Sequence, residues 1–245
     1  METNELNGKI AIVTGAGGGI GSALVKKLTE KGVFCIMVDM HESSNSNLVE
    51  LARENKGEYF SVDLTDIPAI DKFYNDVVAK YDKIDFLYNV AGTGIYKKIG
   101  DLTIEDWNLS IGLNLTAPFY LTKKLIPLLQ KSDKPLVLNI GSGMGVFPTA
   151  GRSAYCASKF GLRGLTLSLA KEFKDDKIKF QLLTLGSVMT GFGDGGVDHK
   201  KDLQKTGKQY LTTESVSEKI VGATVDRNSP TEIEFYPEGY KEENT

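Results

Sequence analysis

Residues 9–21 read KIAIVTGAGGGIG, an apolar run that ends at Thr14 and is followed at once by a loop with five glycines. The run predicts a buried strand, and the loop predicts a tight turn into a helix that begins near Ile20. Such glycines let the backbone approach a pyrophosphate, which then lies at the N-terminus of the helix. A tight turn without a ligand is the alternative, but five glycines cost folding entropy with no structural return.

Apolar strands and amphipathic helices alternate along the rest of the chain. Strands are expected at residues 9–14, 33–39, 58–62, 84–89, 135–141, 178–185 and 232–236, and helices near Ile20, Asn47, Ile67, Glu105, Ser153 and Glu214. This order predicts an α/β fold with a doubly wound, Rossmann-like parallel sheet of seven strands and helices on both faces. Ligands of such sheets bind beyond the carboxyl ends of the strands, so functional residues are expected in the turns there.

Length and composition restrict the class of protein. A chain of 245 residues fits one domain spanning residues 1–245 better than two. The net charge of −3 gives no reason to expect nucleic acid or an anionic membrane as a partner. The first nine residues lack the apolar core of a signal peptide, no apolar run reaches transmembrane length, and two cysteines fit a reduced compartment. We therefore expect a cytoplasmic protein.

Tyr155 and Lys159 are four residues apart in a predicted helix, which places both side chains on one face. A nearby ammonium stabilises a phenolate and lowers the pKa of the phenol, so such a pair can move protons near neutral pH. Taken alone, the pair has the spacing that chance often produces. Ser142, which follows a predicted strand just upstream, adds a hydroxyl to the same region.

These features together resemble the short-chain dehydrogenase/reductase family. The resemblance rests on the glycine loop after Thr14, on Asn89-Val90-Ala91-Gly92, and on Asn114, Ser142, Tyr155 and Lys159, in the family order over nearly the whole chain. Gly15, Gly19 and Gly21 have the spacing of the single-domain relatives. Gly15, Gly18 and Gly21 also fit the extended relatives, but these need a separate substrate domain for which no length remains.

The resemblance implies an oxidoreductase that transfers a hydride between a nicotinamide cofactor and a carbonyl or secondary alcohol of a small molecule. It implies four catalytic residues. Tyr155 would be the general acid/base, Lys159 would lower the pKa of Tyr155 and hold the nicotinamide ribose, Ser142 would position the substrate oxygen, and Asn114 would relay protons through a water. Pro118 lacks an N–H for the carbonyl of Asn114, which predicts a kink in the helix expected over residues 105–130.

The same resemblance implies the residues that bind the cofactor. They are Gly15, Gly18, Gly19, Ile20, Gly21, Asp39, Met40, Asp63, Leu64, Asn89, Ala91, Gly92, Tyr155, Lys159, Gly186, Val188 and Thr190. Among them, Asn89 would mostly tie neighbouring strands together. Leu185 stands where the family has proline, and the loss of a fixed φ is expected to loosen the turn that follows.

Asp39 ends the second predicted strand and favours NAD(H) over NADP(H). A carboxylate there accepts hydrogen bonds from the adenosine ribose hydroxyls and repels a 2′-phosphate. NADP-dependent relatives usually carry a basic residue in the glycine loop or just after this position, whereas here Ala16 and Met40 occupy those places and His41 is mostly neutral at pH 7. A 3-oxoacyl-carrier-protein-type reductase using NADPH and a non-catalytic NAD(H)-binding redox sensor are the alternatives.

Three further expectations concern the surroundings of the site. Residues 190–212 are glycine-rich and then lysine-rich, which predicts a lid over the substrate, and its lysines are read as a solvated face. The chain has two histidines, neither with metal-ligand neighbours, so no metal is expected. The family resemblance implies a homodimer or homotetramer built on the helices that carry Asn114 and Tyr155.

Overall fold

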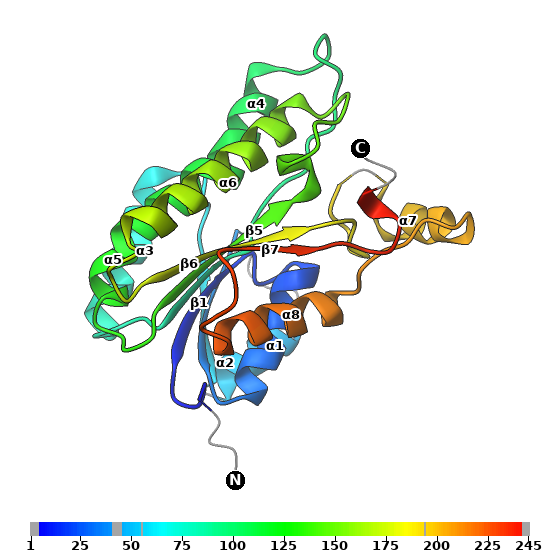
Figure 1. Cartoon of the computed structure of the whole chain (residues 1–245). Helices are drawn as coiled ribbons and strands as arrows, with labels where there is room; N and C mark the ends of the chain where they lie inside the picture. The colour runs from blue at the N-terminus through cyan, green and yellow to red at the C-terminus, as the bar shows by residue number, and fades with distance from the viewer. Residues whose placement is uncertain (1–4, 41–45, 55, 194, 242–245) are drawn as a thin grey trace.

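The computed structural model describes residues 5–40, 46–54, 56–193 and 195–241. One parallel sheet of seven strands, in the order β3-β2-β1-β4-β5-β6-β7, crosses the middle of the molecule (Figure 1). The strands are β1 (Ile10–Thr14), β2 (Phe34–Asp39), β3 (Gly57–Ser61), β4 (Phe86–Asn89), β5 (Leu136–Ser142), β6 (Lys179–Leu185) and β7 (Glu232–Phe235). All seven expected strands are confirmed, each within two residues at its ends.

Helices cover both faces of the sheet, as the sequence predicts (Figure 1). One face carries α1 (Gly19–Glu30), α2 (Ser46–Arg53) and α8 (Thr213–Val225). The other carries α3 (Ile67–Lys80), α5 (Ala117–Leu129) and α6 (Ser153–Glu172), with α4 (Ile104–Ile111) beside α6. Each face packs its own apolar cluster, so both sides of the central strands are buried and these strands read as nearly continuous apolar runs.

The helix expected over residues 105–130 is divided by a π-helical turn, Gly112–Thr116, between α4 and α5. The amide of Ala117 donates to the carbonyl oxygen of Gly112, five residues back. Pro118 lies in the first turn of α5, where its missing N–H costs least. The distortion expected near Pro118 is therefore present, as a widened turn around Asn114.

Residues 190–212, expected as a lid, contain a helix that the sequence did not predict, α7 (Gly196–Lys205). None of its residues is buried, so the segment lacks the apolar period from which a helix is recognised. Among the helices that the structure describes, none is long and apolar enough to cross a membrane.

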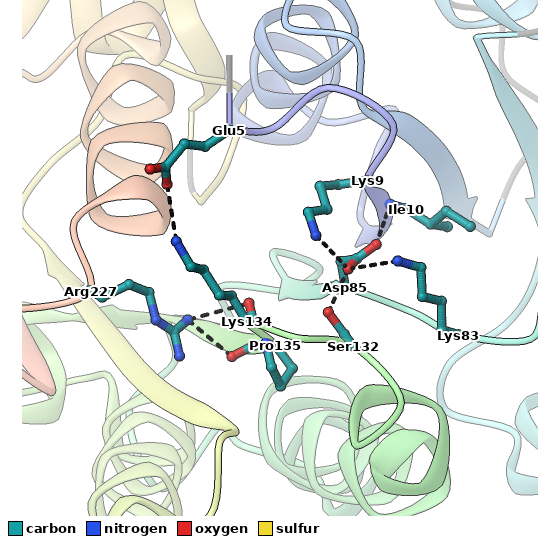
Figure 2. Close-up of polar contacts among 9 residues, drawn as sticks. All are labelled: Glu5, Lys9, Ile10, Lys83, Asp85, Ser132, Lys134, Pro135 and Arg227. Carbon is teal, nitrogen blue, oxygen red and sulfur yellow. Dashed lines mark hydrogen bonds and ion pairs between the residues drawn. The ribbon is translucent and has the colours of Figure 1, made fainter. Parts of the chain in front are cut away.

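The amino ends of the central strands are joined by the buried carboxylate of Asp85 (Figure 2). Its Oδ2 accepts a hydrogen bond from the amide of Ile10 at 2.9 Å, and its Oδ1 accepts one from the hydroxyl of Ser132 at 2.5 Å. Lys9 and Lys83 place their ammonium groups 3.4 and 3.6 Å from Oδ1. This one side chain thus links β1, the start of β4 and the segment between α5 and β5, at the edge opposite the predicted site.

Candidate active site

The glycine loop after β1 has a conformation that requires glycine at two positions. Gly15 has φ +65°, and a Cβ on it would lie 2.8 Å from the backbone of Ala91. A Cβ on Gly21 would overlap the carbonyl oxygen of Gly15. Gly18 is the N-cap of α1 and contributes no capping side chain, so the first amides of this helix remain available to an anion. The loop therefore fits a pyrophosphate.

Replacing Gly21 by alanine is expected to lower the free energy of unfolding by about 1–3 kcal/mol, because the new methyl group displaces the loop. NADH binding should weaken at the same time. Gly222→Ala is the matched control, since Gly222 is exposed in α8 with nothing within 4 Å of the added Cβ. That variant should gain about 0.5–1 kcal/mol of stability. Thermal unfolding and NADH titration of both variants measure the difference, and equal effects would contradict this reading of the loop.

Asp39, at the end of β2, receives two backbone hydrogen bonds. Its Oδ2 accepts from the amide of Gly17 and its Oδ1 from the amide of Met40, each at 2.8 Å. The carboxylate is thereby fixed beside the glycine loop. A carboxylate has about four acceptor sites, so both oxygens can still accept from two further hydroxyl groups. The free acceptor sites of the Asp39 carboxylate fit the two hydroxyl groups of a ribose.

Asp63 and Leu64, which follow β3, line the same end of the cleft as Asp39 and Met40. The Oδ1 of Asp63 accepts from the amide and the hydroxyl of Thr65, at 2.8 and 2.7 Å, which fixes the turn. His41 lies outside the described residues.

The turn after β4 is tied to β1 by Thr14. The hydroxyl oxygen of Thr14 accepts hydrogen bonds from the amides of Val90 and Ala91, at 3.0 and 3.1 Å. Asn89 lies beneath this turn and donates from Nδ2 to Oδ1 of Asn139 at 2.7 Å. The cleft is lined by Val90, Ala91 and Gly92 rather than by the Asn89 side chain, which serves to join β4 to β5.

Asn114 is fully buried behind the cleft, in the π-helical turn. Its Oδ1 accepts from the amide of Thr93 at 2.8 Å, and its Nδ2 donates to the carbonyl oxygen of Thr93 at 2.9 Å and to Oγ of Ser158 at 3.1 Å. The side chain thus fastens the turn after β4 to α6. Because Pro118 has no N–H, the backbone carbonyl of Asn114 lacks its usual α-helical donor.

Ser142, Tyr155 and Lys159 are brought together as the spacing predicts. Ser142 ends β5, and its hydroxyl lies close enough to that of Tyr155, on the facing turn of α6, to lower the pKa of Tyr155. Lys159 lies one turn further along α6, with Nζ 5.8 Å from the centre of the Tyr155 ring. Tyr155 and Lys159 are each 5% exposed. Gly92 borders the group, since a Cβ on it would lie 3.9 Å from Nζ of Lys159.

The expected direction of the Tyr155 pKa is wrong for the protein alone. Burial raises the pKa of Tyr155 above its usual value near 10, and the nearby hydroxyl of Ser142 lowers it only in part. Burial lowers the pKa of Lys159 to about 8. The ammonium of Lys159 donates to the carbonyl oxygen of Ile140 at 2.9 Å instead of to the phenol, so desolvation determines the balance. Tyr155 therefore holds its proton at neutral pH.

The turn after β6 is held firmly, although Leu185 replaces proline. The amide of Met189 donates to the carbonyl oxygen of Leu211 at 2.9 Å. The amide of Leu211 donates to the carbonyl oxygen of Ser187 at 2.8 Å. Lys200, from α7, donates to three carbonyl oxygens of the turn, at 3.1, 2.9 and 2.7 Å. Contacts from residues 200 and 211 thus hold the turn, and the loosening expected from Leu185 stays a prediction.

One continuous cleft of about 1010 Å³ runs along the carboxyl ends of β3, β2, β1, β4, β5 and β6. It joins the glycine loop and Asp39 to Ser142, Tyr155 and Lys159, and it is bordered by the turn that carries Gly186, Val188 and Thr190. An elongated dinucleotide fits this arrangement, with the pyrophosphate at the loop and a ribose at Asp39. No group of acidic, histidine or cysteine side chains in the described residues could hold a metal ion.

The sequence model of the family described as short chain dehydrogenase matches residues 9–201. The chain belongs to the short-chain dehydrogenase/reductase family. The 2,5-dichloro-2,5-cyclohexadiene-1,4-diol dehydrogenase LinX of Sphingobium indicum is 32% identical over 189 residues, which cover 76% of each chain.

Two solved structures of similar oxidoreductases carry nicotinamide cofactors. A 4-hydroxyisoleucine dehydrogenase complexed with NADH has a TM-score of 0.83 at 26% identity, covering 93% of this chain and 96% of that one. The closed form of a serine dehydrogenase complexed with NADP+ has a TM-score of 0.82 at 25% identity, covering 92% and 94%. Since one holds NADH and the other NADP+, the choice of nucleotide has to be argued from the residues of this chain.

The substrate end of this short-chain dehydrogenase/reductase contains residues that the sequence did not single out. Tyr96 packs edge-on to Tyr155 with 5.7 Å between ring centres, and Phe192 lies on it at 5.9 Å. Tyr240, from the end of the described chain, lies against Gly143, while Arg152 precedes α6. These residues come from separate turns, and no motif or spacing in the sequence connects them to Tyr155.

Proposed function

We propose that this protein is an oxidoreductase that transfers a hydride between NAD(H) and a carbonyl or secondary alcohol, with Tyr155 as general acid/base. The observation that carries the proposal is the convergence of Ser142, Tyr155 and Lys159 in one cleft that begins at the glycine loop. Bound NAD(H) would supply the hydride for reduction or accept it for oxidation.

The residues of the chain would divide the work on the substrate oxygen. Ser142 would hydrogen-bond that oxygen and hold it beside the hydroxyl of Tyr155. Tyr155 would donate its proton to the developing alkoxide in reduction and accept the alcohol proton in oxidation. Lys159 would hold the nicotinamide ribose and stabilise the phenolate once the positive nicotinamide is present. The carbonyl of Asn114 would hold a water that returns protons to Lys159.

The proposed cofactor residues keep the assignments of the sequence analysis. Gly15, Gly18, Gly19, Ile20 and Gly21 would hold the pyrophosphate, Asp39 and Met40 the adenosine ribose, and Asp63 and Leu64 the adenine. Ala91 and Gly92 would contact the ribose near the nicotinamide, and Gly186, Val188 and Thr190 would contact the nicotinamide. Every one of these residues lines the cleft.

NAD(H) is the cofactor we propose, with NADP(H) less favoured, because the carboxylate of Asp39, fixed beside the glycine loop, would repel a 2′-phosphate bound there. The adenosine end of the cleft is lined by Asp39, Met40 and Asp63, and like charges at such short range repel. This argument disfavours a carrier-protein reductase that uses NADPH. A non-catalytic redox sensor would bind NAD(H) equally well, but it would not need Ser142, Tyr155 and Lys159 together in the cleft.

Titration with both nucleotides tests this assignment. We expect NADH to bind the wild-type protein about tenfold or more tightly than NADPH, and Asp39→Asn to reduce that ratio by a similar factor. Asp82→Asn, which removes an exposed carboxylate that does not line the cleft, should leave the ratio unchanged. Tighter binding of NADPH by the wild-type protein would contradict the role given to Asp39.

The proposal also covers the domain organisation, the compartment and the assembly of the protein. Residues 1–245 would form a single NAD-binding domain with residues 190–212 as substrate lid, acting in the cytoplasm on a small molecule. A homodimer or homotetramer would use the outer faces of α4, α5 and α6. Large apolar side chains exposed there support this: Ile104 at 63%, Trp107 at 38%, Phe119 at 44% and Phe160 at 42%.

A further inference from the structure

Arg152 lies at the substrate end of the cleft, immediately before α6. Its guanidinium lies over the ring of Tyr96, 4.2 Å from the ring centre, and Nη1 lies 3.4 Å from the sulfur of Met144. Tyr96 in turn packs against Tyr155. A single aromatic ring therefore separates this fixed positive charge from the proposed general acid.

The charge of Arg152 is not neutralised within the described part of the chain, where no carboxylate forms an ion pair with it. Its contacts are an aromatic face and a thioether, which hold the guanidinium in place. They leave N–H groups of the guanidinium available as hydrogen-bond donors. Half-buried arginines ordinarily pair with an anion, as Arg163 does with both oxygens of Glu232. An arginine fixed in this way is therefore suited to a carboxylate that arrives with a ligand.

The acidic residues of the cleft lie at its other end. Asp39 and Asp63 follow β2 and β3, whereas Arg152 follows β5, three strand spacings from β2. At about 4.8 Å per spacing, roughly 14 Å separates Asp39 from the strand end that leads to Arg152. Lys159, Lys200 and Lys208 also line the cleft, but the ammonium groups of Lys159 and Lys200 already donate to backbone carbonyls. The carboxylates of the cleft thus lie away from Arg152, whose guanidinium has N–H groups available to an anion.

Resting on the proposed function, we infer that the substrate is a hydroxy acid or oxo acid whose carboxylate binds Arg152. The carboxylate accepts from the guanidinium while the hydroxyl or carbonyl oxygen lies between Ser142 and Tyr155. Arg152 is a specificity-determining residue in this arrangement, and Tyr96 orients it. A neutral polyol or steroid would leave the guanidinium without its partner.

The inference can be tested without the true substrate by comparing the binding of oxo acids with that of their uncharged amides. The protein saturated with NAD+ is titrated with pyruvate, acetoacetate and 4-oxopentanoate, and with the amide of each, because an oxo compound cannot react with the oxidised cofactor. We expect at least one acid to bind about tenfold to 100-fold more tightly than its amide, as a charge-assisted hydrogen bond would give. Equal affinity within every pair, including no measurable binding, would overturn the inference.

Substitutions of Arg152 test whether this residue causes the preference for the acid over its amide. Arg152→Gln should abolish the preference for the acid, and Arg152→Lys should keep part of it, because lysine retains the charge but not the planar fork. Arg53→Gln removes the same charge from an exposed position on α2 and should change nothing. An acid preference that survives in Arg152→Gln would assign the anion site elsewhere and overturn the role of Arg152.

Titration with NADH separates the two proposals. Wild-type protein that fails to bind NADH would contradict the proposed function itself. Protein that binds NADH but does not distinguish acids from amides would contradict only the carboxylate inference. Retained NADH binding in Arg152→Gln also shows that the variant is folded.

Discussion

Replacing Tyr155 by phenylalanine is expected to lower kcat by about 10²–10⁴-fold, the contribution of a positioned general acid. The hydroxyl is the only part removed, and the ring keeps its packing against Tyr96 and Phe192. Affinity for NADH should stay near that of the wild type, because the loop and Asp39 are untouched. Absorbance of the nicotinamide, with a substrate that the wild type turns over, measures kcat.

The neighbouring tyrosine is the matched control for this variant. Tyr96→Phe also removes one hydroxyl from the cleft, but that hydroxyl has no part in the proposed proton transfer. Its kcat should remain close to the wild-type value. Comparable losses in both variants would assign the effect to packing of the aromatic group, and an active Tyr155→Phe enzyme would contradict the proposed general acid.

Replacing Asp85 by alanine is expected to lower the free energy of unfolding by about 2–4 kcal/mol, because the amide of Ile10 and the hydroxyl of Ser132 lose their buried acceptor. In a domain of this size, that loss corresponds to a fall in Tm of roughly 5–15 °C. Asp85→Asn keeps one acceptor and should lose less. Denaturant unfolding followed by circular dichroism gives the three free energies.

Lys134→Ala provides a control from the same view of the molecule (Figure 2). Lys134 pairs with Glu5 at 3.5 Å, but both side chains are more than half exposed, so its loss should cost less than about 1 kcal/mol. NADH binding at 25 °C should be unchanged in folded Asp85→Ala, since Asp85 lies at the opposite edge of the sheet from the cleft. Stability equal to that of the wild type would contradict the structural role of Asp85.

Most of the fold could be predicted from the sequence because burial on both faces leaves a strong signal in the strands. The run that ends at Thr14, for example, is apolar throughout and is followed at once by glycines. Helix α7 left no such signal, since none of its residues is buried. Pro118 indicated that the helix around Asn114 is distorted, but not that the distortion is a π-helical turn, because the hydrogen-bond register depends on packing.

The sequence predicted where candidate site residues lie when neighbours in the chain are also neighbours in space. The spacing of Tyr155 and Lys159 is of this kind, and so is the position of Asp39 after a strand. Arg152 and Tyr96 are in contact because two separate turns converge in the fold. The spacing of residues in a single sequence does not show such a convergence. The direction of the Tyr155 pKa was missed for a related reason: desolvation depends on the surrounding packing, whereas the spacing showed only the nearby ammonium.

The strand order of the sheet also governs how this chain reaches its folded state. In the sheet β1 lies between β2 and β4, and Ala11 is paired with Phe86 rather than with a residue of an adjacent hairpin. The pairing of β1 with β4 therefore cannot form until the first third of the chain has been synthesised. Until then, the edge of β1 that faces β4 is unpaired. Closing such long loops makes folding slow, and the exposed apolar strand is the segment on which a nascent chain would aggregate or recruit a chaperone.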